Sequence, residues 1–278
     1  MTAATDLPAR ARTGARAASR KGYGFRSTAT MEWLKLRSVR STSWIMLIFT
    51  VAMVGLAILV LKTEHYASMA AADKAAFDPT NDGFTGLTIG QLAFGVLGVL
   101  AVTSEFASGL IRSTFAAVPN RRLVLAAKAA VTGAVMLAVG EIVAFVTFAA
   151  GELALGSPAP HATLGQPNVL RAVLMAGAYP ALIGLIGLGL GAVIRNTAAA
   201  ISTVVGILFV IPLILVPLSA HLHQEIGRFL PMLIGANSIT VVKPVAGYLS
   251  AGPGFGVLCL YAAVALAAGG WALSRRDA

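Results

Sequence analysis

The chain has 278 residues, 57% of them hydrophobic and only 12% charged, and its mean hydropathy is +0.82. These values are typical of an integral membrane protein and exclude an ordinary soluble domain. A net charge of +10 would suit nucleic-acid binding in a soluble chain, but no nucleic-acid-binding module is present, so we expect no such partner. Cys259 is the only cysteine, which excludes an internal disulfide and a cysteine-based metal site.

Residues 1–27 form a basic segment that is rich in Ala, Arg, Thr and Ser and poor in bulky apolar side chains. This composition predicts a disordered cytoplasmic tail that is attracted to anionic membrane lipid. The first long apolar run starts only at Trp44 and has no small-residue cleavage pattern behind it, so we expect no cleaved signal peptide.

Six apolar stretches fill most of the remaining chain, and each is close to the roughly 17–25 residues that a helix needs to cross the hydrocarbon core. A helix satisfies its own backbone hydrogen bonds in a medium that offers none. The sequence therefore predicts an all-α integral membrane protein with a six-transmembrane-helix bundle over residues 44–278. The predicted crossings are residues 44–61, 84–103, 123–150, 172–194, 198–220 and 255–273.

The basic residues predict the orientation of these crossings. If the N-terminus is cytoplasmic, 16 of the 21 Lys and Arg residues fall on the cytoplasmic side. Basic loops are retained on that side during insertion. We therefore expect a multi-pass membrane protein with both termini in the cytoplasm.

The loop between the second and third crossings has the pattern of a short interfacial helix over residues 105–118. Ser104 is placed to cap its start, Glu105 lies in its first turn, and Pro119 follows its end. Such a helix presents an apolar and a charged side to a partner, although a surface helix that only terminates two crossings has the same pattern.

Two carboxylates stand in the third crossing. Glu141 is the one charge well inside an apolar stretch, and Glu152 follows eleven residues later on the same helix face. A charge at this depth is costly, so it must face protein or water. These carboxylates either line a substrate path or bridge helices, and we favour the bridging role.

The fourth crossing has a small-residue face that predicts close helix contact, within the chain or across a pair of chains. The residues of this face are Gly184, Gly187, Gly189 and Gly191. Before the last crossing, residues 229–236 form an apolar run that is too short to span, which suits a re-entrant or interfacial segment on the extracellular side.

Three segments together resemble the permease subunits of bacterial type-2 ATP-binding-cassette exporters. The first precedes the first crossing, the second is the loop after the second crossing, and the third is the turn after the fourth. The matching positions are Glu32, Trp33, Lys35, Leu36, Arg37, Arg40 and Trp44; Glu105, Phe106, Gly109, Ile111, Arg112, Thr114, Ala116, Pro119, Arg121, Arg122 and Lys128; and residues 188–200. The loop departs from the commonest pattern at Phe106 and Leu110.

The resemblance implies a permease of the bacterial plasma membrane that works as a pair, with a second copy or a paralogue, and is driven by two cytosolic ATPase subunits. Residues 28–43 would form an amphipathic N-terminal helix with Glu32, Trp33, Lys35 and Arg37 as its characteristic residues. The loop would be the coupling helix that faces the ATPase. The ATPase-coupling residues carried over are Glu105, Phe106, Gly109, Arg112, Pro119 and Arg121.

The chain itself lacks the phosphate-binding loop of an ATPase, since the dipeptide Gly-Lys occurs nowhere in it. We therefore expect ATP and Mg²⁺ to be bound by the partner subunit, and no cofactor, metal or catalytic residue in this chain. One alternative is an ion-coupled transporter or channel with Glu141 as its protonation site. An intramembrane hydrolase with Ser108 as nucleophile is disfavoured, because all four histidines are expected on the opposite side.

Overall fold

The computed structural model describes residues 24–38, 40–217 and 220–275, so residues 1–23 of the predicted basic tail lie outside the described part. Within that part the secondary structure is entirely helical, and six helices are long and apolar enough to cross a membrane. The prediction of an all-helical fold with six such helices is confirmed. They are α2 (Arg40–Thr63), α5 (Leu87–Ala107), α7 (Arg121–Ala154), α8 (Val169–Ile194), the continuous α9–α10 unit and α13 (Ala251–Arg275).

The α9–α10 unit consists of three consecutive segments. These are α9 (Thr197–Val205), the π-helical turn η3 (Gly206–Val210) and α10 (Ile211–Leu215). Pro212 lies two residues after the end of the π-helical turn and has no N–H to donate to that turn, which accounts for the irregular hydrogen bonding there.

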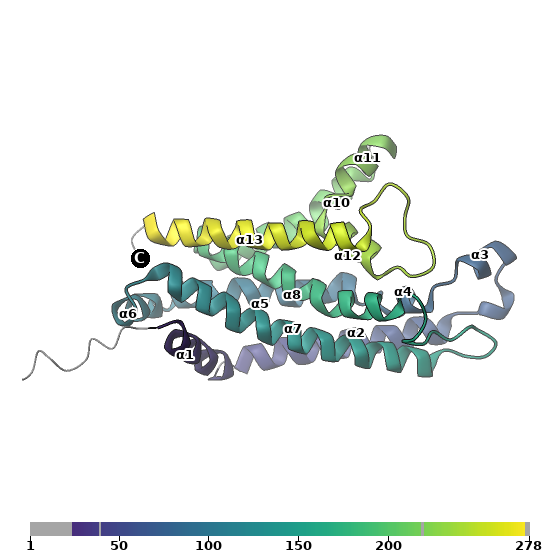
Figure 1. The fold of residues 1–278 in the computed structure, drawn as a ribbon, viewed down its shortest axis with the longest axis horizontal. Coiled ribbons are helices and arrows are strands. Elements are labelled where there is room, and N and C mark those ends of the chain that lie inside the picture. Colours follow the sequence, from purple (N-terminus) through teal and green to yellow (C-terminus); the bar gives the residue numbers. More distant parts are fainter. Residues whose placement is uncertain (1–23, 39, 218–219, 276–278) are drawn as a thin grey trace, which may run out of the picture.

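The helix α8 is the central element of the bundle and packs against α5, α7 and α13 (Figure 1). Its glycines allow backbones to touch. A Cβ atom on Gly98 of α5 would lie 1.8 Å from the carbonyl oxygen of Gly184, and one on Gly189 would lie 2.4 Å from the carbonyl carbon of Ala265 in α13. The predicted small-residue face of α8 therefore makes its contacts within this chain.

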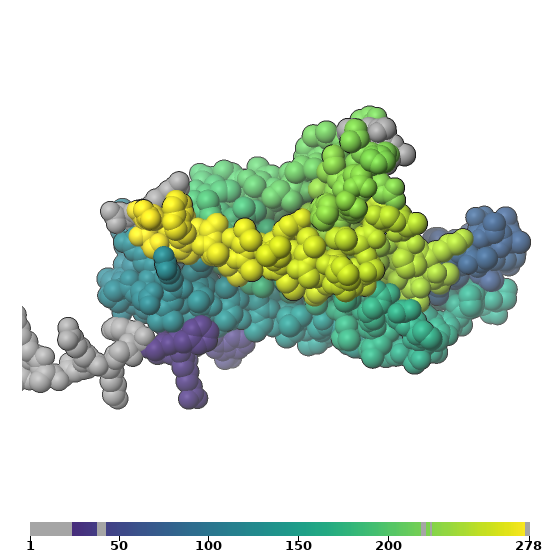
Figure 2. Space-filling model, turned by 45° about the horizontal axis from the view of Figure 1, so that its top comes forward, coloured from purple at the N-terminus to yellow at the C-terminus, as the bar shows by residue number. Residues whose placement is uncertain are grey.

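The long helices differ from the predicted crossings mainly at their ends. The helix α7 has 34 residues, so it is roughly 50 Å long and extends beyond a hydrocarbon core of about 30 Å. The helix α5 starts at Leu87, three residues later than predicted, and continues to Ala107. Figure 2 shows α13 in yellow along most of the length of the molecule.

One end of the bundle carries the two short helices α1 (Phe25–Ser38) and α6 (Leu110–Ala117), and we call it the α1–α6 end. The predicted cap at Ser104 is wrong, because α5 continues through this residue. Glu105 consequently lies in the last turn of α5 and not in the first turn of a new helix. The chain turns at Gly109, whose φ of 74° is in the left-handed region that favours glycine.

The opposite end, which we call the α12 end, carries several short elements, and Asp78 and Arg171 tie the segment around the end of α12 to α4 and α8. The Asp78 carboxylate accepts hydrogen bonds from the backbone N–H groups of Asn81 at 3.0 Å, Val241 at 2.6 Å and Val242 at 2.9 Å. Arg171 donates to backbone carbonyls at the end of α12. The elements are η2 (Tyr66–Ser68), α3 (Ala71–Ala76), α4 (Pro79–Gly83), α11 (Ala220–Gly227) and α12 (Pro231–Ile239).

Candidate functional site: a buried ion-pair ring

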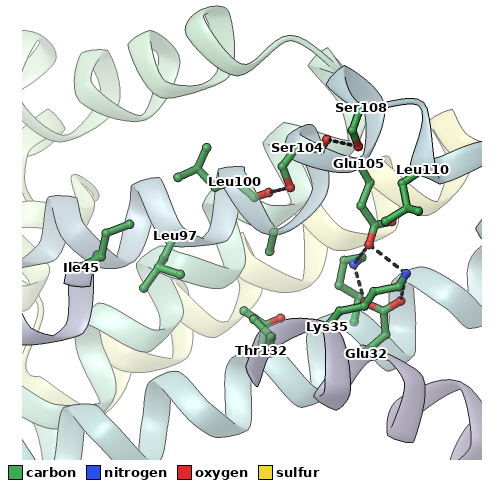
Figure 3. Close-up of a pocket in the computed structure, with 13 residues that line it drawn as sticks. Glu32, Lys35, Ile45, Leu97, Leu100, Ser104, Glu105, Ser108, Leu110 and Thr132 are labelled. Atoms are coloured by element: carbon green, nitrogen blue, oxygen red, sulfur yellow. Dashed lines mark hydrogen bonds and ion pairs between the residues drawn. The ribbon is translucent and has the colours of Figure 1, made fainter. Parts of the chain in front are cut away.

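Four charged side chains from three helices meet at the α1–α6 end and form a closed ring of ion pairs (Figure 3). The Nζ atom of Lys35 lies 2.9 Å from Oε1 of Glu32 and 2.9 Å from Oε1 of Glu105. Lys128 pairs with the same Oε1 of Glu105 at 2.8 Å and with Oε2 of Glu32. Each carboxylate therefore contacts both lysines. We call Glu32, Lys35, Glu105 and Lys128 the ion-pair ring.

Local helix geometry brings the four residues together. Glu32 and Lys35 are three residues apart on α1, a spacing that places two side chains on one helix face. Glu105 is in the last turn of α5, and Lys128 is about two turns into α7. Because α1 packs against α7, its acidic and basic side chains reach both longer helices.

The ring is electrically neutral and mostly shielded from solvent. The side chains of Glu32, Glu105 and Lys128 are 2%, 7% and 6% exposed, while that of Lys35 is 24% exposed. Burial alone lowers the pKa of the Lys35 ammonium, but its hydrogen bonds with Glu105 and Glu32 outweigh this effect and raise the pKa above its ordinary value. Lys35 therefore stays charged at neutral pH, and the ring is held as ion pairs.

The ring also reaches α6. The Nζ atom of Lys35 donates a hydrogen bond to Oγ1 of Thr114 at 3.1 Å. Ile111 and Thr114 form the buried face of α6, whereas Arg112 is exposed. Movement of α6 would therefore be transmitted directly to a buried, hydrogen-bonded contact.

Two arginines connect neighbouring loops to the last helix. Arg121 donates to the carbonyl oxygen of Leu273 at 3.0 Å, and Arg195 donates to that of Ala272 at 3.1 Å. The guanidinium of Arg195 also lies 5.1 Å from the ring centroid of Phe106. Carbonyl groups near the C-terminal end of a helix carry partial negative charge, so cations are favourable there.

The structure brings some of the predicted site residues together and leaves others apart. Glu32, Lys35 and Glu105 meet in the ion-pair ring. The remaining predicted residues Trp33, Arg37, Arg112 and Pro119 are exposed, Phe106 and Arg121 are half-buried, and Gly109 forms the turn between α5 and α6. Lys128 was not predicted as a site residue, although a single cation in an apolar run signals a functional or paired position.

The two carboxylates of α7 have different surroundings. Glu141 packs against Gly177 of α8, where a Cβ atom would lie 2.7 Å from the Glu141 carboxyl carbon. Its Oε2 atom is buried and has no hydrogen-bond partner within the described residues. Glu152 accepts a hydrogen bond from the N–H of Ala162 at 3.0 Å and lies 3.3 Å from Nδ1 of His161. Glu152 thus holds the loop that follows α7.

A cavity of about 380 Å³ adjoins the ion-pair ring. All four ring residues line it, and apolar side chains from α1, α2 and α5 form most of the rest of its wall. In Figure 3, Ile45, Leu97 and Leu100 lie to the left of the ion pairs of Glu105 and Lys35. The ion-pair ring therefore lies at one end of the cavity, and Ile45, Leu97 and Leu100 lie at the other.

The structure gives no support to a hydrolytic role for Ser108, whose hydroxyl donates to the carbonyl oxygen of Ser104 at 2.8 Å. Within residues 24–38, 40–217 and 220–275, no three His, Cys, Asp or Glu side chains are grouped to hold a metal ion. No protein-family model and no curated protein matches the chain. The interpretation of the site therefore depends on its geometry.

Proposed function

We propose that this chain is the permease subunit of an ATP-driven exporter of the type-2 ATP-binding-cassette kind, coupled to a separate cytosolic ATPase. The observation that carries the proposal is the ion-pair ring, which joins α1, α5 and α7 and connects to α6 through Thr114. A partner that presses on α6 or α1 would move two long helices through contacts that are costly to break.

The surface around the ring suits docking of such a partner. Arg112 of α6 is exposed, and so are Trp33 and Leu34 of α1, at 48% and 60%. Exposed arginine and aromatic side chains are enriched at protein interfaces. Glu105 is only 5% exposed, so it contributes to coupling through the two lysines and makes no direct contact with the ATPase.

The proposal includes the expected membrane arrangement. The α1–α6 end faces the cytoplasm, both termini are cytoplasmic, and α12 is a re-entrant segment on the extracellular side. Two permease chains pair within the lipid bilayer, and the partner ATPases bind ATP and Mg²⁺. Labelling of a cysteine introduced at Ser113, after replacement of Cys259, tests the orientation: reagent from outside intact cells should not reach it.

The central experiment is purification of the tagged chain from native membranes, followed by measurement of ATP hydrolysis and identification of co-purified polypeptides. We expect a subunit with a phosphate-binding loop. Arg112→Glu should remove it, because this change reverses an exposed charge on α6. Arg275→Glu is the matched control, since it reverses an exposed charge on α13. Equal retention of the ATPase by both variants would contradict the docking site.

Glu105→Gln separates coupling from docking. It keeps the shape of a buried side chain but weakens the ion-pair ring, so the ATPase should remain bound while ATP-driven transport in inverted vesicles falls. Loss of ATPase binding in this variant would show that Glu105 acts in docking instead.

One observation favours a second candidate, an ion-coupled transporter. The buried Oε2 atom of Glu141 has no hydrogen-bond partner in the part of the chain that the structure describes, as expected of a group that takes up a proton. Transport driven by a proton gradient without ATP, and abolished by Glu141→Gln, would establish this function and exclude the exporter.

A further inference from the structure

Two residues that line the cavity beside the ion-pair ring each carry a polar atom without a hydrogen-bond partner in the described part of the chain. Oε2 of Glu105 and Oγ1 of Thr132 are both buried, and neither has a hydrogen-bond partner among the described residues. Both residues line the cavity and are only 5% and 2% exposed. A buried polar atom without a partner costs about 1–3 kcal/mol, so a molecule that bonds to both atoms gains affinity by relieving this cost.

The environment of Thr132 supports this interpretation. Other threonines in the long helices, such as Thr50 and Thr203, donate their hydroxyl to the preceding turn, and Thr103 donates to the carbonyl oxygen of Val99 at 3.0 Å. The hydroxyl of Thr132 makes no such bond in the described structure. Thr132 lies one turn after Lys128 on the same face of α7, so it is close to the ion-pair ring.

Apart from Ser104 and Ser108, the remaining wall of the cavity is apolar. Its wall includes Leu36 of α1, Ile45 of α2, and Leu97, Leu100 and Ala101 of α5. The volume of about 380 Å³ falls within the range of roughly 300–1,000 Å³ that is usual for small-molecule sites. A ligand that fits this space has an aliphatic body with its polar group at the ring.

The charge of the ring selects a neutral polar group. Two carboxylates and two ammonium groups already compensate one another, so an added charge would lose its hydration without gaining a counterion. A hydroxyl group offers one donor, which suits Oε2 of Glu105, and two acceptor lone pairs, which suit the hydroxyl of Thr132.

We propose that this cavity is a binding site for a neutral amphiphile, an alkyl chain with a hydroxyl head group, of the fatty-alcohol or monoacylglycerol type. The hydroxyl head binds Glu105 and Thr132, and the chain lies against Leu97, Leu100 and Ile45. Binding of this kind does not depend on whether an ATPase drives transport. It places a small molecule against the same carboxylate that joins α5 to α1 and α7.

The test uses the purified full-length protein in zwitterionic phospholipid nanodiscs and a photoreactive medium-chain alkan-1-ol. We expect it to label peptides from residues 36–45 and 97–108, and decan-1-ol to displace it. Decane, which has no hydroxyl, should compete far more weakly. Thr132→Val removes one hydrogen bond, so it should weaken binding of the alcohol by about tenfold.

The matched control is Thr147→Val. Thr147 lies on the same helix and its hydroxyl is also buried without a partner in the described structure, but it does not line this cavity. This variant should bind the alcohol as the unmodified protein does. Ala101→Leu, which fills the cavity, should abolish labelling while the melting temperature shows that each variant is folded.

Equal affinity of Thr132→Val and Thr147→Val would overturn the assignment, and so would equal competition by decane. Labelling of the cavity that decan-1-ol does not displace would do the same, because it would mean that the probe reacts there without occupying a site that binds an alcohol. Lipid extraction from protein purified from native membranes distinguishes the two sources of ligand. A monoacylglycerol enriched in the unmodified protein over Ala101→Leu identifies a bilayer lipid, and binding of the added alcohol without such enrichment identifies a dissolved one.

Discussion

Replacing Lys128 by methionine provides the most direct test of the ion-pair ring. The substitution keeps an unbranched side chain of similar length but removes the cation that lies 2.8 Å from Glu105 and also contacts Glu32. At this distance and an effective dielectric constant of about 20, one pair is worth about 6 kcal/mol of direct attraction, which desolvation of the partners largely offsets. What remains after substitution is a buried, under-compensated carboxylate pair.

We therefore expect Lys128→Met to lower the free energy of unfolding by about 3–5 kcal/mol. Lys35→Met should cost less, about 1–3 kcal/mol, because the Lys35 side chain is 24% exposed and water can replace part of its role. The measurement is unfolding by sodium dodecyl sulfate in mixed micelles, followed by circular dichroism.

The double variant Glu105→Gln/Lys128→Met is the control, since it removes one charge of each sign and leaves Glu32 paired with Lys35. It should be about 1–3 kcal/mol more stable than the sum of the two single effects implies. Additive effects, or equal losses for Lys128→Met and Lys35→Met, would refute the view that the ring is a coupled, buried unit.

Three further predictions concern other parts of the molecule. Gly98→Ala should destabilise the protein by about 1–3 kcal/mol because its Cβ would meet a carbonyl oxygen of α8, whereas Gly55→Ala, in open space, should not destabilise it in the same unfolding assay. Asp78→Ala removes the acceptor of three backbone N–H groups, so limited proteolysis should cut near residues 240–250 much faster than in the exposed control Asp73→Ala. Burial and neighbouring carboxylates raise the pKa of Asp82 from 3.8 to about 6, so the folded state binds more protons than the unfolded state between these values. The free energy of unfolding should therefore fall as the pH rises from about 4 to about 6, and Asp82→Asn should remove this dependence; an unchanged pH profile would contradict it.

The sequence was sufficient to predict the long helices because membrane spans are set by length and hydropathy alone. Six such helices are present, and most predicted ends differ by only a few residues. The start of the loop helix was predicted wrongly for a physical reason. Ser104 has the chemistry of a cap, but α5 continues through it and ends only where Gly109 adopts a positive φ. That glycine was the better signal for the boundary.

The candidate site could be predicted only as separate residues. Glu32 and Lys35 lie on α1 and Glu105 lies on α5, and no sequence pattern indicates that their side chains meet. Pairing depends on how α1 packs against α7, which is a tertiary contact. The same limit applies to Asp78, whose partners Val241 and Val242 lie more than 160 residues away in sequence. The carboxylates of α7 could be located, but not their neighbours.

The glycine contacts of α8 have a mechanical consequence. Where a carbonyl oxygen lies against a glycine of the next helix, the two backbones cannot slide past each other without colliding. Because α8 makes such contacts with α5, α7 and α13, these four helices tilt only as one body. Any shape change in the bundle must therefore take place where packing is looser, at α2 and along the α9–α10 unit. In the apolar segment of each of these, only 22% of the residues are buried.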